Sequence, residues 1–167
     1  ISFNNGEVQY SNRFVRTDAF LAEQDTKTSL WAGITEHPST TIADHGWGAR
    51  TLMKDNASTD VVVHGSKALA SFYQCGELYQ LDPISLTDKG KASWNGAFPP
   101  EGVSAHPKVD EHTGDLLFFN YSTTTPFMKY GVVNSEGDLT NYQDIPLPGP
   151  RLPHDCLLYT SPSPRDP

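Results

Sequence analysis

The sequence predicts an all-β protein, a partial β-propeller of about two blades preceded by an N-terminal segment. Two apolar hairpins carry this prediction, because Ala68 aligns with Leu116 and Tyr73 with Tyr121 at one common spacing of 48 residues. Turn glycines recur near the same spacing. A period in the forties built from four short strands is typical of a propeller blade, since one blade cannot bury both of its faces without neighbours.

The N-terminal segment is expected to contain a strand and a short helix. Apolar residues alternate imperfectly over residues 7–15, which indicates a strand. A helical turn is predicted at residues 19–24, with Thr17 as its N-cap and Asp18 near its positive end. The stretch 33–49 is rich in Gly, Pro, Ser and Thr and predicts a long loop.

Each blade is expected to hold four strands separated by turn residues. The strands of blade one are predicted at residues 60–64, 68–74, 77–81 and 91–94. Those of blade two are predicted at residues 105–109, 116–121, 127–133 and 139–144. The same period would start a third unit near residue 154, where the sequence has His154 in a Leu-Pro-His-Asp run.

The chain has 167 residues, enough for one domain but too few for a closed propeller of at least about four blades. It begins at Ile1, and the repeat is cut as its third unit opens, so we expect a fragment of a longer protein. Residues 1–155 are assigned to the partial propeller. Residues 156–167, including Cys156, lose the repeat and are expected to be a non-native tail that resembles a translated sequencing adapter.

The composition restricts the partners of the chain. Its formal net charge of −8 and pI of about 5.0 argue against nucleic acid, because a phosphate backbone is bound by clustered Lys and Arg. No apolar run approaches the roughly 20 residues that span a bilayer. Two cysteines are too few for a disulfide scaffold and suit a reducing compartment, which favours the cytoplasm but leaves localisation open.

Histidines on successive inner strands form the candidate site. The innermost strand of each blade faces the central channel, so His106 and His154, 48 residues apart, are expected to meet at the axis. Neutral imidazole suits iron, copper, zinc and nickel, and such a site leaves coordination positions open for a substrate or oxygen. Two ligands would hold a metal weakly, so more would have to come from later blades. His64 and His112 stand near turns and are expected to be rim residues.

Several longer motifs occur in one order along the chain. They are Arg13-Phe-Val-Arg-Thr17, Leu81-Asp-Pro83, Ser104-Ala-His-Pro-Lys-Val-Asp110, Gly114-Asp-Leu-Leu-Phe-Phe119, Tyr130-Gly-Val-Val133 and Leu147-Pro-Gly-Pro-Arg-Leu-Pro-His-Asp155. In order and spacing these motifs resemble those of the carotenoid cleavage oxygenases, over roughly residues 6–155.

That resemblance implies a seven-bladed propeller with Fe(II) on its axis, held by four histidines from different blades. His106, in Ala-His-Pro, matches the first ligand motif, and His154, in Pro-His-Asp, matches the second. The implied reaction is cleavage of a conjugated C=C bond by O2 into two carbonyl products, with a small apolar polyene or stilbene-like substrate. The other two ligands would lie beyond this chain, so the fragment alone is expected to be inactive. Peripheral membrane contact of the full-length parent is left open.

One departure lies inside the matched region. Family members carry a Glu that hydrogen-bonds a ligand histidine, whereas this chain has Tyr73 or Gln74 at that position. Losing such a partner typically costs about 10–100-fold in metal affinity or activity, although Gln can still accept an imidazole N–H. No Lys precedes this position as it does in stilbene-cleaving members, which favours a carotenoid, an apocarotenoid or another polyene as the substrate. Thr59 matches a threonine that crowds one open iron position in the family.

Two alternatives to an active oxygenase stay open on the sequence. His106 taken alone is compatible with a hydrogen-bonded structural histidine, so the propeller could be a binding or scaffolding module. The chain could also come from an oxygenase-derived protein that lost its activity through the change at Tyr73 and Gln74.

Overall fold

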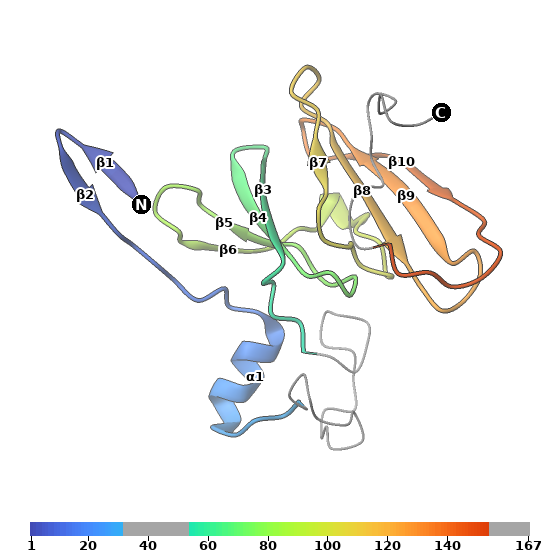
Figure 1. Ribbon diagram of the computed structural model, residues 1–167, viewed down its shortest axis with the longest axis horizontal. Coiled ribbons are helices and arrows are strands. Elements are labelled where there is room, and N and C mark those ends of the chain that lie inside the picture. The colour runs from blue at the N-terminus through green and yellow to red at the C-terminus, as the bar shows by residue number, and fades with distance from the viewer. Residues whose placement is uncertain (32–53, 154–167) are drawn as a thin grey trace, which may run out of the picture.

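The computed structural model describes residues 1–31 and 54–153 (Figure 1). Within these ranges the chain forms a small hairpin, one helix and two four-stranded sheets that lie side by side. The loop predicted at 33–49, His154 and the tail at 156–167 lie outside the described residues. The third repeat unit therefore stays a prediction.

The two sheets are the two predicted blades. Blade one has the order β3-β4-β5-β6 and blade two has β7-β8-β9-β10, and every neighbouring pair is antiparallel. Each sheet is thus a meander in which consecutive strands pair, as in a propeller blade. The strands of blade one are β3 (Asp60–His64), β4 (Lys67–Ser71), β5 (Tyr79–Leu81) and β6 (Asp88–Lys91). Those of blade two are β7 (Lys108–Val109), β8 (Leu116–Tyr121), β9 (Met128–Val133) and β10 (Leu139–Asp144).

The predicted bounds of three strands are wrong by three residues, and β5 begins at Tyr79 rather than at residue 77. Strand β4 ends at Ser71 rather than at residue 74, because residues 73–75 turn and Cys75 has a φ of 60°. Strand β6 covers residues 88–91 rather than 91–94, and a 3-10 helix, η2 (Trp94–Gly96), follows it. Strand β7 begins at Lys108 rather than at residue 105. For β4, β6 and β7 a left-handed residue, which cannot continue a strand, stands in or beside the misassigned stretch.

The hydrophobic core lies between the two blades. Leu69 and Leu78 of blade one pack with Leu116, Phe118 and Val133 of blade two, all of them almost fully buried. The buried Trp94 ring lies 5.0 Å from the Phe118 ring, centroid to centroid. Because burial of apolar surface is the main driving force of folding, this shared core fixes the two sheets against each other.

The N-terminal segment packs on the other face of blade one. Helix α1 (Asp18–Thr26) is longer than the predicted helical turn, and its N-cap Thr17 accepts a hydrogen bond from the Phe20 backbone N–H at 3.0 Å, as predicted. The backbone N–H of Asp18 donates to the Tyr79 hydroxyl at 3.1 Å, and Lys91 pairs with the Asp18 carboxylate at 2.9 Å. The helix is therefore tied to β5 and β6.

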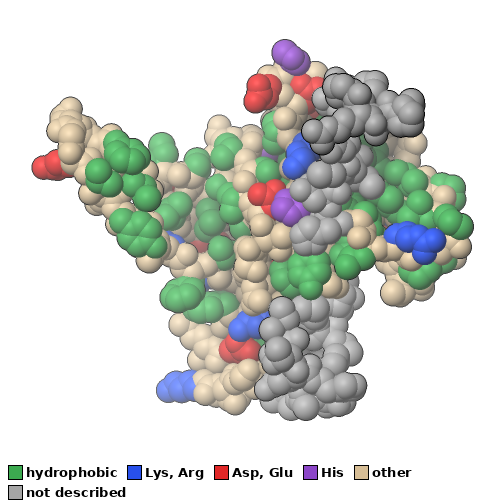
Figure 2. Space-filling view, in the orientation of Figure 1, with side chains coloured by type: hydrophobic (Ala, Val, Ile, Leu, Met, Phe, Trp, Pro, Cys, Tyr) green, Lys and Arg blue, Asp and Glu red, His purple; other side chains and the backbone are tan. Residues whose placement is uncertain are grey.

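The first residues form a hairpin that stands away from the blades (Figure 1). Its strands are β1 (Ser2–Asn4) and β2 (Glu7–Gln9), so the strand predicted over residues 7–15 ends at Gln9. Hydrophobic side chains lie along it in the space-filling view (Figure 2), and Phe3 and Val8 are largely exposed. Within residues 1–31 and 54–153 no helix is long and apolar enough to cross a membrane.

One face of strand β3 is also uncovered in the described chain. Val62 packs against the core, whereas Val61 and Val63, which alternate with it, are 58% and 56% exposed. A propeller blade normally has a neighbour on each side, and this face is where blade one would receive one.

Candidate metal centre

His106 lies in the loop that leads into β7, two residues before the strand. Its φ of 61° is left-handed, and its neighbours Ala105 and Pro107 are almost completely buried. The backbone N–H of Ser104 donates to the Phe119 carbonyl at 2.9 Å, which pairs this loop with blade two. The prediction that His106 is part of the inner strand is therefore wrong, but the loop that carries it is firmly anchored.

A carboxylate from blade one lies beside His106. The Oδ2 atom of Asp60 is 3.3 Å from Nδ1 of His106, and both side chains are largely buried. Asp60 is the first residue of β3, and β3 and β7, the first strands of the two blades, lie next to each other. Asp60 was not predicted from the sequence. The 48-residue repeat offered a signal, because it aligns residue 60 with residue 108 at the start of β7, two residues after His106.

Thr59 and Gln74, the other predicted site residues, occupy the same end of blade one. The Oγ1 atom of Thr59 accepts a hydrogen bond from the Tyr73 backbone N–H at 3.2 Å, and the Thr59 N–H donates to the Ser71 carbonyl at 3.0 Å. Gln74 is half-buried in the turn that follows β4. Their suggested roles toward a metal stay predictions.

The turn that carries Gln74 is fixed to blade two. The Tyr73 carbonyl accepts hydrogen bonds from the Tyr121 hydroxyl and from Oγ of Ser104, the latter at 3.3 Å. Burial raises the pKa of Tyr121 far above its usual range, so its hydroxyl stays protonated and can donate. Cys75 adds a contact between its Sγ and the Tyr121 backbone N–H at 3.4 Å.

A pocket of about 560 Å³ opens beside Gln74. Its lining comes from this turn, from the end of β8 and from the segment that leads toward His154, and includes Cys75, Pro100, Glu101, Tyr121, Ser122, Thr123, Pro150, Arg151 and Leu152. Volumes of about 300–1,000 Å³ are usual for small-molecule sites. The pocket lies at the same end of the blades as the loop of His106, because β4 and β8 both end there.

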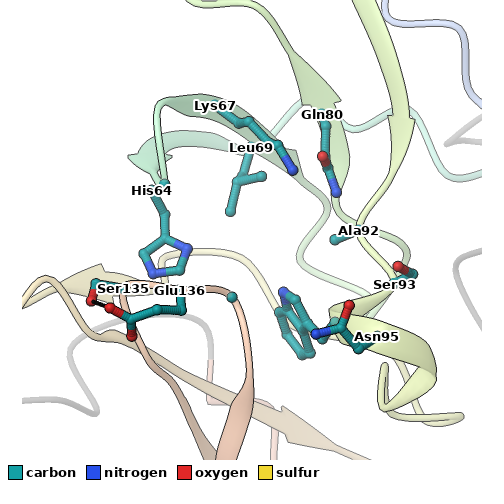
Figure 3. Close-up of a pocket in the computed structure, with 12 residues that line it drawn as sticks. His64, Lys67, Leu69, Gln80, Ala92, Ser93, Asn95, Ser135 and Glu136 are labelled. Atoms are coloured by element: carbon teal, nitrogen blue, oxygen red, sulfur yellow. Dashed lines mark hydrogen bonds between the residues drawn. The ribbon is translucent and has the colours of Figure 1, made fainter.

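His64 lies at the opposite end of β3, next to the β3–β4 turn as predicted, but it is buried. It is only 7% exposed, and its Nε2 atom has no hydrogen-bond partner among the described residues. Burial lowers its pKa. The ring lies next to the turn of Ser135 and Glu136 in blade two, at the edge of a polar pocket of about 200 Å³ (Figure 3). His112, in contrast, is exposed in the β7–β8 turn, as predicted.

The described residues do not by themselves form a metal site. Across residues 1–31 and 54–153, no group of three or more His, Cys, Asp and Glu side chains is placed to hold a metal ion. His106 nevertheless fits the role of a ligand, because metal-binding histidines usually have a carboxylate or carbonyl beside the ring nitrogen that does not bind the metal. Its predicted partner His154 lies outside the described part of the chain.

Comparisons with curated proteins find several enzymes. The chain is 33% identical over 159 residues to isoeugenol monooxygenase of Pseudomonas nitroreducens, covering 93% of this chain and 32% of that protein. It is 26% identical over 159 residues to lignostilbene-alpha,beta-dioxygenase isozyme III of Sphingomonas paucimobilis, covering 93% and 31%. The carotenoid 9,10(9',10')-cleavage dioxygenase 1 of Pisum sativum is 26% identical over 183 residues, covering 95% and 31%. The chain thus spans about a third of the length of these relatives.

Solved structures support the fold, and a family match identifies the chain. A mutant of the Synechocystis apocarotenoid oxygenase superposes with a TM-score of 0.61 at 20% identity, over 82% of this chain and 30% of that chain. This likeness confirms the predicted partial propeller. The family described as "Retinal pigment epithelial membrane protein" matches residues 1–160. The chain therefore belongs to this family, which confirms the resemblance to the carotenoid cleavage oxygenases that the motifs predicted.

Proposed function

We propose that the full-length protein, meaning one of the relatives' length that carries this chain, is a non-haem Fe(II) oxygenase. It cleaves a conjugated C=C bond with O2 and yields carbonyl products. The family match over nearly the whole chain and the names of its relatives support this activity. The observation that carries the proposal is the position of His106. It lies in an anchored loop where the first strands of the two blades, β3 and β7, are next to each other.

In this proposal His106 and His154 supply two of the iron ligands, and histidines of further blades supply the others. Iron held there would supply the activation of O2 that cleavage of the double bond requires. Thr59 lies one residue before β3 and would restrict access to an open iron position. Gln74 would accept the N–H of a ligand imidazole in place of the family's Glu.

The substrate class in this proposal is a small apolar molecule with a conjugated double bond. The pocket beside Gln74 supports it, since its volume of about 560 Å³ suits such a molecule and apolar surface prevails in its lining. A polyene is favoured over a stilbene because no Lys stands before the turn at Tyr73, where the sequence has Phe72.

Iron analysis of the full-length protein tests the proposal. We expect bound iron in the purified protein, loss of both iron and C=C cleavage in His106→Ala, and retention of both in His112→Ala. The control is matched, because His112 is another histidine of blade two and lies exposed in the β7–β8 turn. A folded wild-type protein without iron would refute the oxygenase and favour a binding or scaffolding propeller.

A further inference from the structure

We infer that Asp60 is a positioning residue for the ligand His106. Its carboxylate holds the imidazole through Nδ1, so that Nε2 is the nitrogen presented to the metal. The inference rests on the proposed function and deepens it, because the chain then supplies a carboxylate partner for a ligand histidine from a position other than Tyr73 or Gln74.

The Asp60 carboxylate is itself held in place. Its Oδ1 atom accepts a hydrogen bond from the Val61 backbone N–H at 2.8 Å, which leaves Oδ2 directed at His106 Nδ1, 3.3 Å away. The backbone of Asp60 is paired with Ser71 across β3 and β4, and the Ser71 hydroxyl donates to the Asp60 carbonyl at 3.2 Å. The carboxylate therefore belongs to a residue of an ordered strand. One of its oxygens contacts the Val61 N–H and the other contacts His106.

The backbone of His106 is equally constrained. Ala105 and Pro107 are buried on either side of it, and its left-handed φ of 61° is uncommon for a residue other than Gly. Such a conformation costs energy and persists where the surrounding structure enforces it, often at functional sites. With the main chain fixed, rotation of the imidazole is the remaining freedom, and a carboxylate at Nδ1 restricts that rotation.

A carboxylate at Nδ1 also has a chemical effect. It favours the tautomer with the proton on Nδ1, which leaves the lone pair of Nε2 for a metal. The distance of 3.3 Å is longer than a typical N–H···O hydrogen bond. Because the two side chains are only 20% and 28% exposed, solvent screens the interaction less than at the surface.

The contact between Asp60 and His106 also connects the two blades. Asp60 stands at the start of β3 in blade one, whereas His106 precedes β7 in blade two. The contact thus sets the imidazole relative to blade one as well as to its own blade.

The test uses Asp60→Ala and Asp60→Asn in the full-length protein, with Glu111→Ala as the control. Glu111 is an exposed carboxylate in the β7–β8 turn. The readouts are bound iron per chain, the rate of iron loss to a chelator, and the absorption spectrum of the protein loaded with Co(II). We expect Asp60→Ala to weaken iron retention by about 10–100-fold and to shift the cobalt spectrum. Asp60→Asn keeps a neutral acceptor and should lie between Asp60→Ala and wild type.

Unchanged iron retention together with an unchanged cobalt spectrum in Asp60→Ala would overturn the inference. If Asp60→Ala does not fold, Asp60→Asn decides by the same two readouts. If the proposed function is wrong, the result differs: the wild-type protein binds no iron, and both proposals are refuted. If the wild-type protein binds iron and Asp60→Ala changes neither iron retention nor the cobalt spectrum, the proposed oxygenase is retained and only the positioning role of Asp60 is refuted.

Discussion

Gly131 and Phe118 face each other across β8 and β9, and the glycine makes room for the ring. A Cβ atom placed on Gly131 would lie 2.2 Å from Cζ of Phe118. Phe118 is fully buried, and its ring packs at a tilt of 38° against Trp94 of blade one. The absence of a side chain at residue 131 therefore allows the central aromatic contact between the two blades.

The first prediction follows from this contact. Gly131→Ala should destabilise the chain by about 1–3 kcal/mol, because the added methyl group forces the Phe118 ring out of a well-packed core. Urea unfolding followed by tryptophan fluorescence measures the change. Gly149→Ala is the matched control, since a Cβ there would have, among the described residues, only an Arg151 nitrogen within 4.0 Å and should leave the midpoint unchanged. Equal stability of the two variants would contradict the packing argument.

The second prediction concerns pH and His64. Burial lowers the pKa of folded His64 below the value of about 6.5 expected in the unfolded chain. The unfolded state then binds more protons, so stability is fully present above about pH 6.5 and is lost as pH falls toward the folded pKa. Thermal unfolding at pH 7.5 and pH 5.5 should show this loss in wild type and a smaller loss in His64→Gln.

His112→Gln is the control for this pH dependence. His112 is exposed in a turn, so removing its imidazole should leave the difference between the two pH values as in wild type. If His64→Gln keeps the full wild-type difference, another group is responsible for it.

The third prediction concerns the buried amide of Asn120. Its Nδ2 donates to the Gly102 carbonyl and to the Tyr142 hydroxyl, both at 2.8 Å, and joins the linker between the blades to β8 and β10. Asn120→Ala should cost about 1–3 kcal/mol, because the buried carbonyl of Gly102 loses its partner. Tyr142→Phe should cost less in the same urea experiment, since Asn120 can still donate to Gly102. A larger loss in Tyr142→Phe would be inconsistent with this ranking.

The fourth prediction concerns the helix cap. Thr17→Ala removes the acceptor of the Phe20 N–H and should lower stability by about 0.5–2 kcal/mol. Thr17→Ser keeps the hydroxyl and should restore most of the loss. Far-ultraviolet circular dichroism during urea unfolding reports both variants, and identical curves for Ala and Ser would argue that the cap is unimportant.

The sequence by itself determined the repeat and the family. The spacing of 48 residues located both blades, because short strands and turn glycines are local features that recur wherever the same blade is built. Thr17 was predicted as an N-cap for a similar reason, since a cap depends on residues within one turn of the helix. The motif around His106 is contiguous and could also be recognised without a structure.

The tertiary structure alone decided which residues meet across the seam between the blades. His64 is buried because the β9–β10 turn of blade two lies against it, and nothing in its own strand predicts that neighbour. Oδ2 of Asp60 lies 3.3 Å from Nδ1 of His106, although the two residues are 46 positions apart in the chain. Local patterns specify strands, but the packing of one sheet against another depends on the summed shape of many side chains, so contacts between blades had to come from the fold.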